Sequence, residues 1–253
     1  EIPSALKSSN RPTLKGRILV VDDRRDMIFL AQHLIEDAGG TVAAPPPDHV
    51  RALQLRLAIE GALDAAREAG VGHMLCVCID LEEFGTVRDL AAQHAQISAS
   101  VGVHPNERDG RDPEVDELIE LARDENIVAI GETGLDYFRS EGDLEWQRER
   151  FRRHIAAARE IGKPLIVHMR DATDDTLAVL EQENARDAGG VMHCFTETWQ
   201  MARAALALNF YISFSGIVTF KNAGDLRDVA KQVPLDRRAI SLGPESQSIG
   251  QRL

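Results

Sequence analysis

The sequence is short of cysteine, of long apolar runs and of positive charge, and each shortage excludes a class of protein. Three cysteines among 253 residues cannot build a disulfide framework, which favours a reducing, cytoplasmic location. No apolar run approaches the ~18 residues of a membrane-spanning helix, so we expect no membrane partner. The polar, basic opening residues 1–17 contain no apolar core, so no secretory signal is visible.

The charge balance restricts the partners of the chain. Lysine and arginine number 29 against 41 acidic residues, which gives a formal net charge of −12. A protein with this charge does not bind a polyanion through bulk electrostatics, so such a partner needs a local basic patch or a bridging metal. The hydrophobic content of 43% with 28% charged residues is that of an ordinary globular protein and excludes a disordered chain. We find no strong signal for a protein partner.

Short apolar runs alternate with amphipathic helical segments along the chain. This alternation is typical of parallel βαβ units, and eight of them in about 250 residues predict an α/β fold of the (β/α)8 TIM-barrel type. A doubly wound open sheet is the alternative, but no GxGxxG motif follows the first apolar run. The expected strands are 17–21, 73–79, 97–103, 128–131, 165–168, 191–195, 211–215 and 239–242. The expected helices are 26–38, 50–69, 84–94, 113–125, 144–161, 172–184, 198–208 and 223–232.

Polar side chains stand at the ends of four neighbouring expected strands. They are His104, Glu132, His168 and His193. Active sites of such barrels lie at the carboxyl ends of the strands, so these groups are expected to converge on one rim. Imidazoles with a carboxylate suit a divalent metal such as Zn or Mn. A bound metal lowers the pKa of its water to near ~7 and neutralises a phosphate substrate, so an acidic protein need not repel one.

Several other residues are candidates for contacts with a substrate. Arg170 follows His168 by two residues and could bind an anionic oxygen, although a surface ion pair with Asp171 or Asp174 is the alternative. Tyr137 and Phe138 follow the fourth expected strand and are candidates for stacking on bases. The arginines at 148, 150, 152 and 153 are expected on a solvated helix face, mixed with Glu145 and Glu149.

Five motifs occur in barrel order between residues 59 and 237: SVGVHPNE, VAIGETGLDYF, GKPLIVHMRDA, GVMHCFTE and YISFSGIVTF. This region resembles the TatD family of metal-dependent hydrolases. The resemblance implies a metallo-dependent hydrolase barrel, one or two divalent ions (Zn, Mn or Mg) and hydrolysis of phosphodiester bonds in DNA. It further implies that Glu132 bridges two metals, that His168 and His193 bind one of them, and that His104 lies near the substrate.

The sequence departs from the family pattern at both ends. The HxH pair that usually follows the first strand is absent, and the run after Val21 reads Asp22, Asp23, Arg24, Arg25 and Asp26. Gly243 stands where the family has an acidic ligand. One metal site therefore loses three protein ligands, whereas Glu132, His168 and His193 are enough for a three-ligand site. The candidate substitute ligands are Asp22, Asp23 and Asp26.

These departures suggest a division of the chain. Residues 1–58 form an atypical N-terminal segment, residues 59–243 the TatD-like barrel and residues 244–253 a non-matching tail. The sequence stops after the eighth expected strand, which predicts a truncated C-terminal end. Residues 17–42 resemble the opening strand and helix of a receiver domain, in which the acidic pair Asp22 and Asp23 would hold Mg²⁺. No phosphoacceptor aspartate follows, so we do not interpret this segment as a working receiver.

Three functions follow from these observations. The first is a hydrolase acting on ester bonds, a metal-dependent exonuclease or deoxyribonuclease in which metal-activated water cleaves DNA or another phosphodiester. The second is a catalytically impaired relic of the same barrel, because the HxH pair and the last acidic ligand are missing. The third is a signalling protein led by the receiver-like segment.

Overall fold

The computed structural model describes residues 17–21, 59–61, 63–68, 70–108, 110–138 and 140–242. Within them, eight parallel strands pair in chain order and form a closed barrel, as the alternating pattern predicted. The strands are β1 (Arg17–Val21), β2 (Val71–Cys76), β3 (Ile97–Val101), β4 (Ile127–Asp136), β5 (Leu165–Arg170), β6 (Gly190–Met192), β7 (Phe210–Phe214) and β8 (Arg238–Leu242). The α-helices are α3 (Phe84–Gln93), α4 (Val115–Ala122), α5 (Glu145–Ile161), α6 (Thr173–Gln182), α7 (Trp199–Ala207) and α8 (Gly224–Gln232).

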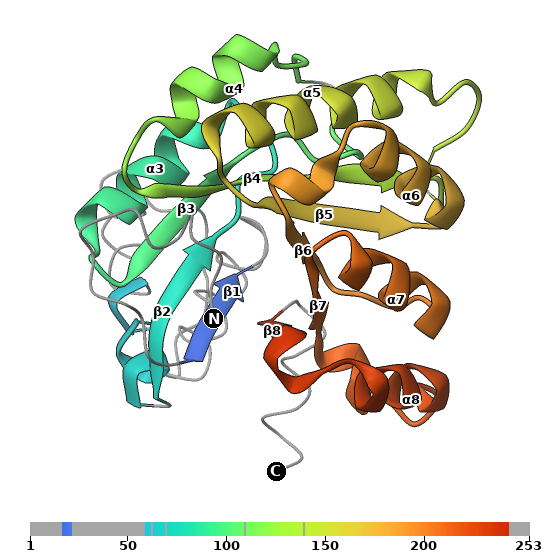
Figure 1. Cartoon of the computed structure of the whole chain (residues 1–253). Coiled ribbons are helices and arrows are strands. Elements are labelled where there is room, and N and C mark those ends of the chain that lie inside the picture. Colours follow the sequence, from blue (N-terminus) through green and yellow to red (C-terminus); the bar gives the residue numbers. More distant parts are fainter. Residues whose placement is uncertain are drawn as a thin grey trace, which may run out of the picture.

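The helices lie on the outer side of the strands, as Figure 1 shows for α4 to α8. Strand β1 pairs with β2 along its length and with β8 through Val20 and Val21, and this second pairing closes the barrel. The expected strands and helices that fall within the described residues are all present, with boundaries shifted by a few residues. Apolar runs separated by amphipathic helices therefore encode this fold directly.

Two apolar clusters fill the two faces of the sheet. The larger one joins helix residues such as Phe151 and Ile155 to strand residues such as Leu165, so it lies between the helices and the barrel wall. The smaller one contains Val77, Ala129 and Ile166, which face the other way because successive strand side chains alternate. In a closed barrel this second face is the interior, and side chains further along it point to the barrel mouth.

Strand β4 is longer than the sequence predicted. We expected it to end at Gly131, but it continues to Asp136. Its register to β5 shifts by one residue between Ile130 and Thr133, which is a β-bulge. Gly131 and Gly134 both have a φ of 136°, a conformation that side chains with a Cβ rarely adopt. The prediction ended the strand too early, because the two glycines let the backbone bend and the strand continue through them.

Parts of the predicted organisation lie outside the described residues. Among them are the expected helix 26–38, most of residues 1–58 and the tail 244–253. The division of the chain into three parts therefore stays a prediction, although β1 shows that the first part contributes one strand to the barrel. Within the described residues, no helix is both long and apolar enough to cross a membrane. All three cysteines lie in this part of the chain, and their thiols are free.

Candidate metal centre

Strand alternation brings two of the predicted histidines to the mouth of the barrel. Ile166 and Val191 pack in the interior cluster. His168 and His193 follow two residues later on the same sides of their segments, because the side-chain period of a strand is two. His168 lies within β5, and His193 directly follows β6. Glu132 joins them from the bulged part of β4, which is the kind of position where a bulge redirects a side chain.

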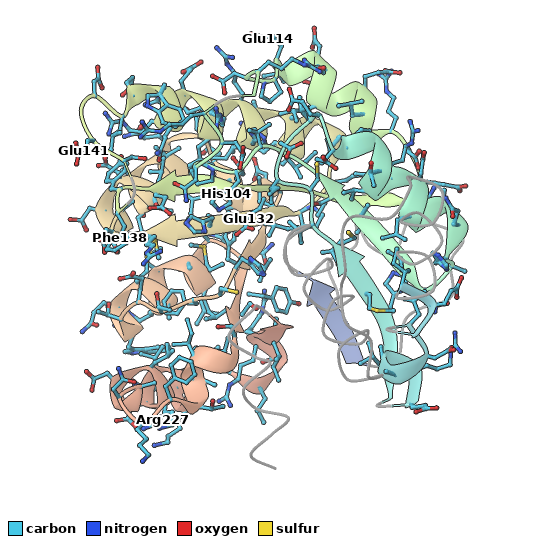
Figure 2. All side chains as sticks on the ribbon, turned by 180° about the vertical axis from the view of Figure 1, so that it is seen from behind. His104, Glu114, Glu132, Phe138, Glu141 and Arg227 are labelled. Atoms are coloured by element: carbon cyan, nitrogen blue, oxygen red, sulfur yellow. The ribbon has the colours of Figure 1, made fainter. Side chains whose placement is uncertain are left out.

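The carboxylate of Glu132 stands between the two imidazoles. It is 3% exposed, and its Oε1 atom lies 2.9 Å from Nδ1 of His193 and 3.6 Å from Nδ1 of His168. One ligand atom each from His104, Glu132 and His168 lies within 4.8 Å of the other two. Figure 2 shows His104 and Glu132 next to each other. The structure therefore brings the four predicted rim residues together.

The charges of these groups depend strongly on one another. Burial raises the pKa of Glu132, but the positive charge of His193 and the contact with His168 outweigh it, and the pKa falls well below its usual range. Burial lowers the pKa of His168, but its contacts with Asp136 and Glu132 raise it to about 9. The pKa of His193 is likewise raised, because the charge of Glu132 outweighs burial. The carboxylate is thus ionised, and protons on the imidazoles supply its countercharge.

The residues present fit a divalent cation. A buried carboxylate needs a positive charge beside it, and a cation can take the place of the two imidazole protons. One oxygen and two nitrogen donors match the ligands of zinc and similar ions in three-ligand sites that keep an open position. Binding would release protons, so the affinity for the cation should rise with pH. We therefore regard Glu132, His168 and His193 as the candidate ligands.

His104 has the right distance to be a ligand but the wrong hydrogen position. Its Nδ1 atom accepts a hydrogen bond from the backbone N–H of Asn106 at 3.1 Å. Burial, with the nearby positive charge of His168, lowers the pKa of His104 to about 4, so the ring is neutral at neutral pH. A neutral ring whose Nδ1 accepts must carry its hydrogen on Nε2. His104 therefore offers a donor, which suits a substrate oxygen better than a metal.

Sequence reasoning missed Asp136, which belongs to the same cluster. Its side chain is 1% exposed, and its Oδ2 atom lies 3.0 Å from Nε2 of His168. The side-chain amide of Asn106 donates to the same oxygen at 2.8 Å. The GETGLD motif points to Asp136 only once the strand is known to continue past Glu132, because Asp136 then lies four residues later on the same face.

Arg170 and Phe138 form a stacked pair at the same end of the barrel. The guanidinium carbon of Arg170 lies 3.8 Å from the centre of the Phe138 ring. Arg170 makes no ion pair with Asp171 or Asp174 among the described contacts, so the surface-pair alternative receives no support. Phe138 is 59% exposed, which is unusual for so large an apolar side chain. A stacked guanidinium keeps its N–H groups for an anion.

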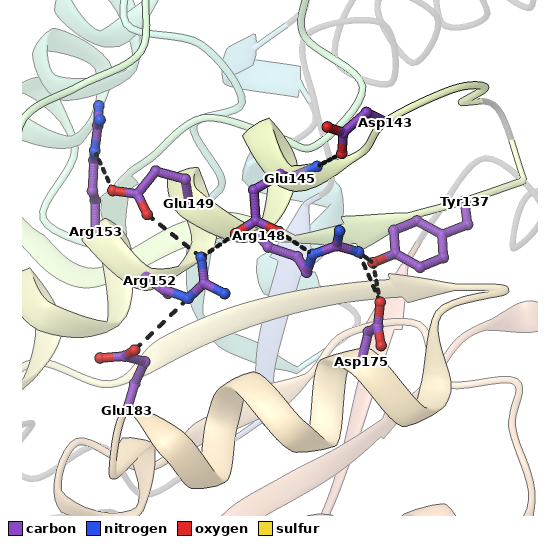
Figure 3. A network of polar contacts seen from close by, with 9 residues as sticks. All are labelled: Tyr137, Asp143, Glu145, Arg148, Glu149, Arg152, Arg153, Asp175 and Glu183. Carbon is purple, nitrogen blue, oxygen red and sulfur yellow. Dashed lines mark hydrogen bonds and ion pairs between the residues drawn. The ribbon is translucent and has the colours of Figure 1, made fainter.

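The hydroxyl of Tyr137, a predicted substrate contact, is used for packing. It donates to Asp175 at 2.5 Å and accepts from Arg148 at 2.8 Å, between α5 and α6. Figure 3 shows this network, in which Arg148 and Arg152 both pair with Glu145. The hydroxyl is thus held between the two helices, and the predicted stacking of the Tyr137 ring on a base stays a prediction.

The arginines of α5 behave as predicted with one exception. Arg148, Arg152 and Arg153 form ion pairs with surrounding glutamates on the partly exposed face of the helix. Arg150 is instead buried: it donates to the carbonyls of His104 and Glu107, each at 2.8 Å, and forms an ion pair with Asp112. It thereby fixes the loop that carries His104. Helical spacing could not distinguish this arginine from its neighbours.

The remaining candidates give no support for a second metal site. Asp22, Asp23 and Asp26, predicted as substitute ligands, lie outside the described residues, as does Gly243. Cys76 and Cys78 carry thiols whose pKa burial raises to about 11 and about 12, which is typical of structural cysteines. Cys194 follows His193, and its sulfur lies 3.7 Å from Nε2 of that ring.

Similarity to known proteins identifies the family. The model of TatD-related DNases matches residues 49–240. The chain belongs to the TatD family. It is 48% identical over 183 residues to the uncharacterized metal-dependent hydrolase YcfH of Escherichia coli K12, an alignment that covers 72% of this chain and 68% of the relative. It is 34% identical over 174 residues to the 3'-5' ssDNA/RNA exonuclease TatD of Klebsiella pneumoniae, which covers 68% and 66% of the two chains.

Solved structures agree with this TatD assignment. The crystal structure of YjjV, a TatD homologue from E. coli, has a TM-score of 0.66 and 28% identity, and the match covers 71% of this chain and 70% of that one. A TatD-family hydrolase from Entamoeba histolytica shares the fold with a TM-score of 0.64 at 24% identity, over 76% and 69% of the two chains. The family resemblance and the barrel fold predicted from the sequence are thus confirmed, and the TatD relatives are metal-dependent hydrolases.

A buried histidine next to this TatD site yields a prediction about stability. Nε2 of His154 accepts from the backbone N–H of Val103 at 3.0 Å, and Nδ1–H donates to the carbonyl of Arg150, 2.8 Å away. Burial lowers the pKa of His154 from 6.5 to about 4. The unfolded chain therefore binds this proton more tightly than the folded chain does. The stability that the neutral His154 ring contributes is thus complete above about pH 6.5 and is lost as the pH falls toward about 4.

We expect the loss to be about 2 kcal/mol of unfolding free energy between about pH 7.5 and about pH 5. Comparison with His154→Gln isolates the effect, because the other histidines titrate alike in both proteins. Urea unfolding at the two pH values should show the gap between wild type and variant shrinking by that amount. If the difference in unfolding free energy between wild type and His154→Gln stays constant with pH, the pKa of His154 is not lowered by folding.

Proposed function

We propose that the chain is a metal-dependent deoxyribonuclease that removes nucleotides from the end of a DNA strand. The observation that carries this proposal is the arrangement at the barrel mouth. Glu132 stands between His168 and His193, and the cationic side chain of Arg170 lies near the same end of β5, stacked on exposed Phe138. A cation site beside a phosphate-binding group and an aromatic ring suits a phosphodiester between nucleosides.

Each residue has a defined task in this proposal. Glu132, His168 and His193 hold the divalent ion. When bound, the ion lowers the pKa of water and offsets the charge of the phosphate. The guanidinium of Arg170 binds a phosphate oxygen, held flat by the ring of Phe138. His104 donates its Nε2–H to a second oxygen, because its Nδ1 is occupied by the N–H of Asn106.

Two further considerations support a nucleic acid as the substrate. The TatD protein of Klebsiella pneumoniae is named as a 3'-5' ssDNA/RNA exonuclease. The net charge of −12 disfavours a long contact with a polyanion, whereas an enzyme that acts on a strand end needs only a local site. The cytoplasmic location stays a prediction from the free cysteines.

The test is a nuclease assay of the full chain with Mn²⁺, Mg²⁺ or Zn²⁺. The substrate is single-stranded DNA labelled at one end, and a second sample carries the label at the other end. We expect stepwise release of nucleotides that stops with a chelator and returns with metal. If the protein binds metal but releases nothing from any nucleic acid, the impaired-relic alternative gains support and the nuclease proposal is rejected.

Removing the stacked pair should weaken substrate binding more than it changes the maximal rate. Arg170→Ala removes a charge-assisted hydrogen bond of about 1.5 to 3 kcal/mol, so we expect kcat/KM to fall by about ten- to hundredfold, chiefly through KM. Phe138→Ala removes stacking of about 1 to 3 kcal/mol and should act in the same direction. Phe138 is exposed, so its loss should leave the fold intact.

Two variants serve as controls for this pair. Arg123→Ala removes an exposed arginine that pairs with Glu120 at the end of α4. Leu235→Ala removes an exposed apolar side chain that precedes β8, and so belongs to the opposite end of the barrel. Both should hydrolyse DNA like the wild type. If KM is equal for wild type, Arg170→Ala and Phe138→Ala, then Arg170 and Phe138 do not bind the substrate.

A further inference from the structure

A second carboxylate, Asp136, lies behind one of the candidate metal ligands. It is the last residue of β4 and is 1% exposed. Its Oδ2 atom lies 3.0 Å from Nε2 of His168, on the side of the ring remote from Glu132. A carboxylate oxygen at this distance accepts the N–H of the ring. Asp136 therefore holds the hydrogen of His168 on Nε2.

This hydrogen position decides which nitrogen of His168 can bind a cation. With Nε2 protonated, the free lone pair of the neutral ring is on Nδ1. Nδ1 lies 3.6 Å from Oε1 of Glu132, which is too long for a hydrogen bond. Two ligand atoms at about 2.1 Å from one tetrahedral ion are about 3.4 Å apart. The gap between Nδ1 and Oε1 is thus close to the spacing of two ligands that share a cation.

Asp136 is itself fixed from two directions. The side-chain amide of Asn106 donates to Oδ2 at 2.8 Å. Gln147 holds the backbone: its Oε1 accepts the N–H of Asp136 at 2.9 Å, and its Nε2 donates to the carbonyl at 3.2 Å. The amide oxygen of Asn106 has no partner among the described residues, so the bond from its amide nitrogen to the carboxylate orients this side chain. These contacts leave Asp136 little freedom to turn away from His168.

We propose that Asp136 is a positioning residue that makes His168 bind the catalytic cation through Nδ1. Asn106 connects this role to the substrate side of the site, because its backbone N–H fixes the hydrogen of His104 on Nε2. The rings of His104 and His168 pack edge to face, with their centres 4.4 Å apart. His168 thus offers a lone pair to a cation, whereas His104 offers an N–H to an anion. The inference rests on the proposed metal-dependent function.

The first test measures metal affinity without any turnover. Titration of the full chain with Mn²⁺ or Zn²⁺ against a competing chelator gives the Kd for wild type, Asp136→Ala and Asp136→Asn. Loss of such an outer partner weakens metal binding by about ten- to hundredfold, and we expect this for Asp136→Ala. Asp136→Asn keeps the shape and an acceptor oxygen but loses the charge, so its Kd should rise less. If Asp136→Ala does not fold, the Kd of Asp136→Asn relative to that of the wild type decides whether Asp136 has this positioning role.

The second test observes the ring directly. Nitrogen NMR of histidine-labelled, zinc-loaded protein should show the His168 hydrogen on Nε2 and the metal on Nδ1 in the wild type. Asp228→Asn makes the same chemical change in an exposed ion pair of α8 and should alter neither the Kd nor the spectrum.

The outcomes separate this inference from the proposed function. If the wild type binds metal and Asp136→Ala binds it equally well, or if His168 binds through Nε2, the positioning role is overturned while the hydrolase proposal stands. If the wild type binds no divalent ion, both are overturned.

Discussion

Glu132→Gln should lower the rate of phosphodiester hydrolysis by about a thousandfold. The carboxylate is the common partner of His168 and His193, and its low pKa keeps it ionised. The amide that replaces it has the same shape but carries no charge to hold a cation. A divalent ion contributes several kcal/mol to such reactions, and each 1.4 kcal/mol is tenfold in rate. Initial rates with saturating metal measure the loss.

The matched control is Glu120→Gln, which makes the same change in an exposed ion pair of α4. It should retain the wild-type rate. Circular dichroism of both variants shows whether the barrel is preserved. If Glu132→Gln hydrolyses DNA at a rate within a few-fold of wild type, Glu132 does not hold the reactive ion.

Gly134→Ala should destabilise the fold and disturb the site together. Gly134 has a φ of 136°, and a Cβ there would overlap the backbone carbonyl of His168 on the neighbouring strand. An unfavourable backbone conformation costs about 1 to 3 kcal/mol, and overpacking costs a similar amount. We expect the free energy of unfolding to fall by about 2 to 6 kcal/mol, measured by urea denaturation. The displaced His168 should also bind metal more weakly.

Gly142→Ala separates the two contributions. Gly142 also has a positive φ, of 85°, but a Cβ at this position meets no atom within 4 Å. This variant should lose only the conformational part and should bind metal like the wild type. Equal losses of stability in the two variants would show that close approach of β4 to β5 at Gly134 is not required.

The barrel could be predicted from the sequence because its signal is repeated. Each strand is a short apolar run, and each helix is amphipathic with a clear end, such as Gly162 after α5. The rim residues followed from the same pattern, because parallel strands of a barrel present their carboxyl ends at one mouth. The strand ends predicted the four rim residues, and the resemblance to the TatD family distinguished Glu132, His168 and His193 among them as candidate ligands.

The details that the sequence did not yield depend on contacts between distant segments. Asp136 was overlooked because β4 was predicted to stop at Gly131, and only pairing with β5 shows that it continues. Tyr137 was expected to stack on a base, and the bond from its hydroxyl to Asp175 on α6 was not foreseen. Buried Arg150 looks like its exposed neighbours in the sequence, and the loop that it holds comes from another part of the chain. No local pattern encodes such partners.

The central claim is that Glu132, His168 and His193 share a divalent cation at the barrel mouth. Equilibrium dialysis of the full chain against Mn²⁺ or Zn²⁺, followed by elemental analysis, tests it most directly when wild type and a Glu132→Gln, His168→Ala double variant are compared. The account predicts stoichiometric metal in the wild type and a loss of that metal in the folded double variant. Equal metal content in the two proteins, or none in the wild type, would contradict it.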